Sequence, residues 1–314
     1  MTWATTKAKP TAEKPLEAKF GADYYRALFD RKRENLAPIR MALVGKENTT
    51  KTGTALSLAL AHTDKDVVVI DCDNSAGNTV DYLTSQDPSL ADRIRVIPMV
   101  DEFDEAMWNE DNTTNWVAVV EKVEWFTSFI ADSAEHIGAV VFDGGSTFLK
   151  WCEFVMTERL VARGTIKDES DSFNQKEWRT RNQLFREVMS RLHGLAVPSV
   201  FFTFHLKDVS NYVDNGNGGK VLMKVGERPE WEKGTMRLFS QQIFLSRYMK
   251  KADTAAGVKA DPSLKNDDDW VVKATIEEIK GKHMEHIGET HTILSVIKGD
   301  VKWAGLPMLT WSDE

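Results

Sequence analysis

Short, uninterrupted apolar runs recur along the chain, separated by segments with helical periodicity. The runs are IRMALVG at 39–45, DVVVID at 66–71, RIRVIP at 93–98, IGAVVFD at 137–143 and PSVFFTFH at 198–205. Because their apolar residues do not alternate with polar ones, we expect strands buried on both faces. Between the runs, helices are predicted at 51–62, 114–134, 147–163 and 175–194. The pattern therefore predicts an α/β fold with a mainly parallel central sheet and helices on both of its faces.

The pattern changes at both ends of this region. Residues 206–230 contain an NGNGG turn between short apolar stretches and predict a long loop or a hairpin. Further strands, expected to be antiparallel, are predicted at 242–250, 270–280 and 291–298, with an exposed acidic turn at 259–270. At the other end, residues 1–37 predict a mobile tail followed by an amphipathic helix at 21–35. Residues 38–314 are then expected to form one domain.

Composition excludes several classes of protein. The 314 residues include 40 Lys and Arg against 48 Asp and Glu, a net charge of −8, so any nucleic-acid contact must use a local basic patch. Two cysteines exclude a disulfide framework and favour a cytoplasmic protein. No run of 18 apolar residues is present, so no membrane span is expected.

The segment VGKENTTKT at 44–52 follows the first predicted strand and precedes a predicted helix. It matches the phosphate-binding loop G-x-x-x-x-G-K-[ST], with Thr50 in place of the second glycine. In such a loop the backbone N–H groups and the helix N-terminus hold phosphates, Lys51 neutralises their charge, and the Thr52 hydroxyl binds Mg²⁺. The expected nucleotide contacts are Gly45, Lys46, Glu47, Asn48, Thr49, Thr50, Lys51, Thr52 and Gly53. If Thr50 adopts positive φ, a β-branched residue is costly there.

Polar residues also follow the other predicted strands, at the sheet edge where α/β folds bind ligands. Asp71 and Asp73 flank Cys72 where the second apolar run ends. We expect one of them to face the nucleotide, and we favour Asp73. Asp143 is placed to position Mg²⁺. Each aspartate could instead cap the next helix. His205 ends the last apolar run and is either structural or a contact of the γ-phosphate.

The order of these motifs resembles the RecA-like recombinase ATPases, closest to the compact versions of phages, viruses and plasmids. The resemblance covers residues 38–305 and implies ATP and Mg²⁺ as cofactors, with Asp73 as the catalytic carboxylate and His205 as the γ-phosphate sensor. The IKGK segment resembles the family's inter-subunit pair, here Lys280 and Lys282, and implies a ring or filament of identical subunits. The segment after His205 would bind single-stranded DNA through Lys207, Tyr212, Lys220, Lys224 and Arg228 during recombination, annealing or replication.

A second resemblance points elsewhere. Lys46 precedes Lys51 by five residues, as in the deviant loop of the ParA/MinD-like positioning ATPases, in which the first lysine reaches across a dimer. Two further possibilities are a nucleotide-binding module without turnover, which Thr50 allows, and a helicase-like hexamer.

Overall fold

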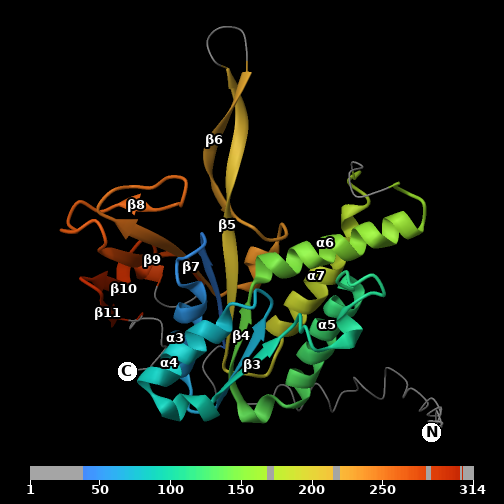
Figure 1. Cartoon of the computed structure of the whole chain (residues 1–314), viewed down its shortest axis with the longest axis horizontal. Helices are drawn as coiled ribbons and strands as arrows, with labels where there is room; N and C mark the ends of the chain where they lie inside the picture. Colours follow the sequence, from blue (N-terminus) through green and yellow to red (C-terminus); the bar gives the residue numbers. More distant parts are fainter. Residues whose placement is uncertain (1–37, 168–172, 215–219, 281–283, 305, 307–314) are drawn as a thin grey trace, which may run out of the picture. The chain divides into compact units, whose positions relative to one another are not determined.

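The computed structural model describes residues 38–167, 173–214, 220–280, 284–304 and 306 (Figure 1). The tail and helix predicted within 1–37 lie outside these ranges. The strands are β1 (Ile39–Gly45), β2 (Asp66–Asp71), β3 (Ile94–Pro98), β4 (Ile137–Asp143), β5 (Ser199–Asp214), β6 (Lys220–Pro229), β7 (Gln241–Met249), β8 (Lys259–Ala260), β9 (Trp270–Ile279), β10 (Thr290–Ile297) and β11 (Asp300–Trp303). The helices are α3 (Lys51–His62), α4 (Ala76–Gln86), α5 (Trp116–Asp132), α6 (Gly145–Ala162) and α7 (Trp178–His193).

One sheet organises the fold, in the order β11-β10-β9-β7-β1-β5-β4-β2-β3. From β7 to β3 neighbouring strands are parallel, whereas β9, β10 and β11 are added antiparallel to one another beyond β7. The predicted class, a mainly parallel sheet with antiparallel strands on the C-terminal side, is confirmed. None of the described helices has the length and hydropathy needed to cross a bilayer.

Helices cover both faces of this sheet, which explains the unbroken apolar runs. Met41 and Leu43 of β1 pack in the cluster that includes α3, while Ala42 and Val44 pack on the opposite side with α5, α6 and α7. Successive residues of one strand point to opposite faces, so a strand covered on both faces needs apolar residues at every position. In Figure 1, α3 and α4 lie on one side of the parallel strands and α5, α6 and α7 on the other.

Two sequence predictions were wrong in detail, and one helix was not predicted. β7 was expected to be antiparallel but pairs parallel with β1, and it is antiparallel only to β9. The strand expected to end at His205 continues to Asp214. α4 was not predicted; Ala76 is its one fully buried residue, and Val80 and Leu83 pack on the core while only partly buried.

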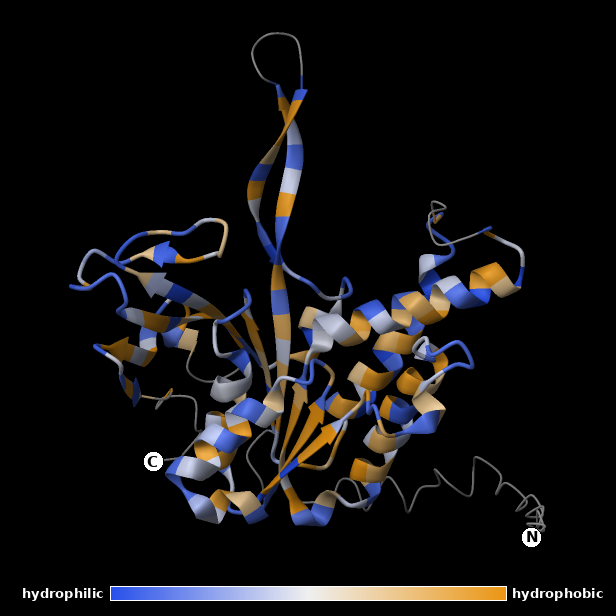
Figure 2. Cartoon of the chain, viewed as in Figure 1, coloured by the Kyte–Doolittle hydropathy of each residue, from blue (hydrophilic) through white to orange (hydrophobic). Residues whose placement is uncertain are grey.

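The outer half of β5 pairs with β6 to form a two-stranded ribbon that stands out from the sheet (Figure 1). We call residues 206–214 and 220–229 the arm. The sequence allowed either a long loop or a hairpin here, and the pairing of β5 with β6 corresponds to the hairpin. Figure 2 shows hydrophobic and hydrophilic residues mixed along both of its strands. Its exposed apolar side chains are Tyr212, Val213, Val221, Leu222, Met223 and Val225.

Candidate nucleotide-binding site

The carboxyl ends of four parallel strands meet at one edge of the sheet. β5 lies between β1 and β4, with His205 in register with Gly45. On the next pair of strands, Asp71 is in register with Asp143. The polar residues that follow the apolar runs in the sequence are therefore neighbours in space, as expected for the ligand-binding edge of an α/β sheet.

The loop between β1 and α3 folds tightly around its own polar groups. A Cβ at Gly45 would lie 2.3 Å from Thr49 Oγ1 and 2.9 Å from the Leu245 carbonyl oxygen, so only glycine fits there. Asn48 and Thr50 have φ values of 57° and 56°. Thr50 thus adopts the left-handed conformation that glycine would take without strain, at a cost of order 1–2 kcal/mol for a side-chain-bearing residue. The chain still passes directly into α3, with Thr50 as the residue before its first turn.

Lys51 begins α3 and is buried beneath the loop. Its Nζ donates to the Lys46 carbonyl oxygen at 2.9 Å and lies 3.5 Å from His205 Nδ1. Burial lowers the pKa of this ammonium, whereas the nearby carboxylates of Asp143 and Asp73 raise it. The fold therefore holds a desolvated positive charge inside the loop, where an anion would replace the weak carbonyl contact.

Asp143 is the most enclosed carboxylate of the site, with 1% of its surface exposed. Its Oδ2 accepts hydrogen bonds from Thr52 Oγ1 at 2.8 Å and Ser75 Oγ at 2.9 Å. Its Oδ1 accepts one from Thr203 Oγ1 at 2.6 Å. Burial raises the pKa of Asp143, against the lowering effect of these hydroxyls.

The two aspartates that follow β2 have different surroundings. Asp71 accepts backbone hydrogen bonds from Asp73, Ser75 and Ala76, and so holds the turn that begins α4. Asp73 points toward His205, whose Nε2 lies 3.8 Å from Asp73 Oδ2. Asp73 Oδ1 is buried and accepts no hydrogen bond from the described residues. A Cβ at Gly144 would lie 1.9 Å from that oxygen, so glycine makes room for it.

Oxygen donors suitable for Mg²⁺ lie together here. Thr52 Oγ1, Ser75 Oγ and Asp143 Oδ2 are within hydrogen-bonding distance of one another. Hard cations prefer such oxygens, and Mg²⁺ on a nucleotide keeps waters and phosphate oxygens as its other ligands. Within the described ranges no group of three or more His, Cys, Asp or Glu side chains could hold a metal ion alone. The donors fit a cation that arrives with a phosphate.

A pocket of about 770 Å³ opens from the loop, within the range typical of small-molecule sites. At one end it is lined by Lys51, Thr52, Asp73 and His205. At the other end its lining becomes aromatic and aliphatic, with Tyr82, Leu83, Leu294, Val301 and Trp303. The Trp303 ring lies over the first turn of α3, 3.7 Å from where a Cβ of Gly53 would be. The pocket is thus charged where phosphates would sit and aromatic beyond.

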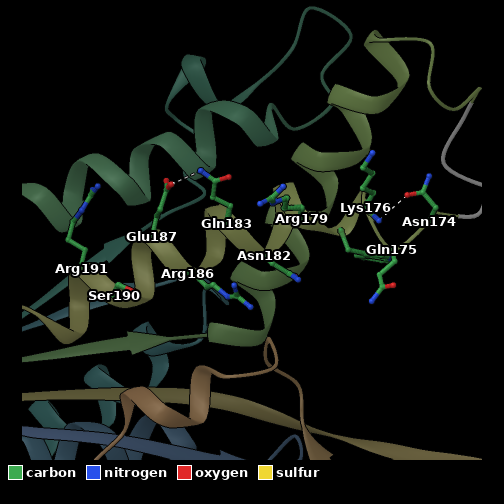
Figure 3. Close-up of a pocket in the computed structure, with 11 residues that line it drawn as sticks. Asn174, Gln175, Lys176, Arg179, Asn182, Gln183, Arg186, Glu187, Ser190 and Arg191 are labelled. Carbon is green, nitrogen blue, oxygen red and sulfur yellow. Dashed lines mark hydrogen bonds between the residues drawn. The ribbon is translucent and has the colours of Figure 1, made fainter.

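A larger hollow of about 1170 Å³ runs along α7 (Figure 3). The residues that line it all come from positions 174–191, and they include Lys176, Arg179, Arg186 and Arg191. Arg186 is held by Glu232, and Arg191 by Ser128 and the Glu124 carbonyl. None of the polar residues at the ends of the parallel strands lines this hollow. We therefore assign the candidate nucleotide-binding site to the smaller pocket, which Lys51, Thr52, Asp73 and His205 line.

The described residues expected to reach a neighbouring subunit or DNA lie outside this pocket, and so does the side chain of Lys46, which was expected among the nucleotide contacts. Lys280 Nζ donates to the Phe239 and Arg237 carbonyl oxygens, at the end of the short 3₁₀ helix Thr235–Leu238. Lys282 lies outside the described residues. Lys46 points away from the pocket and pairs with the base of the arm. On the arm, Lys207 pairs with Glu230 and Lys224 with Asp208 and Glu227, while Tyr212, Lys220 and Arg228 are exposed.

Sequence reasoning missed several residues of the site. Ser75 and Thr203 hold Asp143, and the Ser146 hydroxyl accepts from the His205 N–H and donates to the Glu230 carbonyl. Ser75 and Thr203 each lie two residues from a residue that was predicted, so their closeness in sequence was a usable signal. Trp303 had no such signal, because it reaches the pocket through pairing of β11 with β10.

Comparison with known proteins gives the family. A model described as an AAA domain matches residues 37–243, more than half of the chain, including the strands that carry Gly45, Asp71, Asp143 and His205. The chain belongs to the AAA domain family. By family it is therefore a P-loop ATPase, and this membership supports nucleotide binding. The comparison with curated proteins gives no match.

Solved structures with similar folds include a recombinase and an ATPase. The crystal structure of the RadB recombinase aligns with 85% of this chain and 91% of its own, at 12% identity and a TM-score of 0.42. An ATPase of the type III secretion system of pathogenic bacteria aligns with 66% of this chain and 51% of its own, at 12% identity and a TM-score of 0.34.

The strain at Thr50 can be measured. We expect Thr50→Gly to raise the free energy of unfolding by about 1 kcal/mol, because glycine removes the left-handed penalty but gains unfolded-state entropy. Urea unfolding of the apo protein measures it. Asn48→Gly is the matched control and should change stability less, since Asn tolerates positive φ. A destabilised Thr50→Gly protein would contradict the assignment of strain.

The buried charge of Asp143 predicts a pH-dependent trade-off. Its folded-state pKa is raised above the unfolded value near 3.8, so the stability it contributes is greatest at low pH and is lost as pH rises. Asp143→Asn removes this penalty, and the three hydroxyls can rotate to serve the amide. We expect the thermal midpoint to rise by about 2–4 °C near neutral pH, with a smaller gain in acid.

The same substitution at Asp71 is the contrast. Asp71→Asn should lower the midpoint, because one amide oxygen cannot accept all three backbone N–H groups that Asp71 now accepts. If Asp143→Asn also destabilises the protein at every pH, the charge of Asp143 is not the costly group.

Proposed function

We propose that the chain binds ATP with Mg²⁺ in the pocket above α3 and hydrolyses it, and that the nucleotide state controls a grip on single-stranded DNA. The observation that carries the hydrolysis is the convergence of a phosphate loop, the Thr52–Asp143 pair and Asp73 at one end of one pocket. This arrangement supplies groups for cation binding, phosphate binding and the positioning of a water at the same pocket.

Phosphate binding falls to the loop and to Lys51. The loop N–H groups and the start of α3 present positive partial charge, and Lys51 adds a full charge that burial keeps unscreened. On arrival of a phosphate, the Lys51 ammonium exchanges the Lys46 carbonyl for a charged acceptor, a stronger hydrogen bond. Mg²⁺, when bound, neutralises the charge of the β- and γ-phosphates. Thr52 and Asp143 would hold that ion in place.

Asp73 is the proposed base. Asp73 lines the pocket with its Oδ2 3.8 Å from His205 Nε2, and its Oδ1 accepts no hydrogen bond from the described residues, so the carboxylate has unused capacity to hold an attacking water. Attack of that water on the γ-phosphorus breaks the bond to the bridging oxygen of ADP, and the water's proton passes to Asp73. His205 lies between Asp73 and Lys51 and is placed to contact the γ-phosphate.

The aromatic end of the pocket would take the base of the nucleotide. Trp303 and Tyr82 are 37% and 48% exposed and both line the pocket beyond the loop. Planar rings that are partly exposed at a pocket rim suit stacking with a nucleobase. The C-terminal strands would in this way complete the site from within the same chain.

Binding of single-stranded DNA is proposed for the arm. Tyr212 is 71% exposed and can stack on a base, and Lys220 and Arg228 can meet phosphates. Assembly into a ring or filament, action in recombination, annealing or replication of a virus or mobile element, and a cytoplasmic location are part of the proposal through the RecA-like resemblance.

A ParA/MinD-like dimer is the second candidate, and Lys46 weighs against it. That mode needs Lys46 to reach the nucleotide of a partner subunit. In this chain its ammonium lies 3.1 Å from Asp208 and 3.0 Å from Glu227 of its own arm. Reaching across a dimer would require both contacts to break.

Phosphate release tests the proposed activity. We expect Mg²⁺-dependent ATP hydrolysis whose rate changes when single-stranded DNA is added. Asp73→Asn should lower the rate by about 100-fold or more while ATP still binds, since a positioned base contributes about 10²–10⁴-fold. Lys51→Ala should abolish ATP binding. Absence of turnover under every condition would favour a binding module, and a rate indifferent to DNA would remove the DNA part of the proposal.

The nucleobase contact is tested with two ligands. We expect Trp303→Ala to weaken ATP binding about tenfold, because an aromatic–base stack contributes about 1–3 kcal/mol. Binding of inorganic triphosphate, which has no base, should stay unchanged. Lys51→Ala is the matched control and should abolish binding of both ligands in calorimetric titrations. Equal losses for both ligands in Trp303→Ala would show that Trp303 acts on the loop rather than on the base.

A further inference from the structure

Four charged side chains form a compact cluster where the arm leaves the sheet. Lys46 Nζ lies 3.1 Å from Asp208 Oδ1 and 3.0 Å from Glu227 Oε1. Lys224 Nζ contacts the same two oxygens at 2.8 and 2.6 Å. Asp208 belongs to β5 and Glu227 to β6, where they face each other across the ribbon. Lys46 is therefore joined to both strands of the arm at once.

The stem of Lys46 is fixed as well as its charge. Gly257, with φ of +69°, lies against it, and a Cβ there would be 2.2 Å from Lys46 Cδ. The Lys46 side chain is 18% exposed, against 48% for that of Asp208. A packed stem costs less entropy to order than a free surface lysine, so these ion pairs hold one geometry better than exposed pairs do.

The backbone of Lys46 belongs to the phosphate loop. Its carbonyl oxygen accepts hydrogen bonds from Lys51 Nζ at 2.9 Å and from Thr49 Oγ1 at 2.8 Å. The lysine that would bind phosphate is thus attached to the main chain of Lys46, and the side chain of Lys46 is attached to the arm. A bound phosphate that draws the Lys51 ammonium away from this carbonyl oxygen would remove a hydrogen bond to Lys46, the residue whose side chain is paired with the arm.

We propose that Lys46 couples the phosphate loop to the arm, so that occupation of the loop changes how the arm is held. The ligand part of this proposal rests on the proposed binding of a nucleotide. His205 gives a separate route from the site to β5, and its carbonyl oxygen accepts a hydrogen bond from the N–H of Glu230, the residue after β6. Lys46 is the residue through which the loop reaches both strands, and its role is positioning rather than contact with the nucleotide.

A probe on the arm tests the coupling in the full chain. Cys72 and Cys152 are buried, so a spin label on Tyr212→Cys, near the arm's end, should attach selectively. We expect its mobility to change when Mg²⁺ and a non-hydrolysable ATP analogue are added. Lys46→Met should reduce this change about threefold or more, the scale of an ion-pair contribution near 1 kcal/mol. Affinity for the analogue, measured by calorimetry, should change less than the label response.

Lys207→Met is the matched control. It removes another lysine–carboxylate pair at the base of the arm, 3.4 Å from Glu230, without touching the loop. The label should respond to the analogue in this variant as in the parent. A full response in Lys46→Met would overturn the proposal, and so would a parent protein that binds the analogue without any change at the label.

Hydrogen exchange keeps the test independent of nucleotide binding. Asp208→Asn combined with Glu227→Gln changes only the arm, yet should speed exchange of the loop amides at 47–51 by about three- to tenfold. Lys207→Met should leave these amides unchanged. If the parent binds no nucleotide, the proposed function fails while this measurement still decides the coupling. Unchanged loop amides in the double variant would overturn it.

Discussion

The carboxylate of Asp143 is the contact on which the site depends. Asp143 is the last residue of β4 and is buried. Its carboxylate accepts hydrogen bonds from hydroxyl groups in three other parts of the chain, those of Thr52, Ser75 and Thr203. A buried anion without such donors would cost several kcal/mol, so these hydroxyls cannot leave without penalty. Asp143 therefore fixes the first turn of α3, the turn before α4 and the middle of β5 relative to one another.

Around this contact the protein keeps three unfavourable features side by side. Thr50 has a left-handed backbone, Lys51 is a desolvated cation and Asp143 a desolvated anion. The apolar side chains packed on both faces of the sheet supply the stability that offsets these costs. Strain and buried charge concentrated at one place are typical of functional sites, where a ligand relieves what the empty protein tolerates.

The sequence allowed the parallel strands and the phosphate loop to be predicted because both are local patterns. Residues that end consecutive apolar runs must meet at one edge, so Asp143 and His205 could be placed near Lys51 without coordinates. Pairing between distant segments could not be read in this way. The partner of Lys46 lies more than 160 positions away on the arm, and Trp303 is brought over Gly53 only by the order of the C-terminal strands. β5 was expected to end at His205 because burial ends there, although its backbone continues.

That continuity has a mechanical consequence. β5 runs without a break from the buried sheet, past His205, to Asp214. At about 3.3 Å per residue, the nine steps from His205 to Asp214 span about 30 Å. A tilt of about 10° at the pivot would then displace the far end by about 5 Å, close to the spacing of neighbouring strands. A paired ribbon resists bending better than a single strand, so a small rotation beside the phosphate loop would move the far end of the arm by several ångströms.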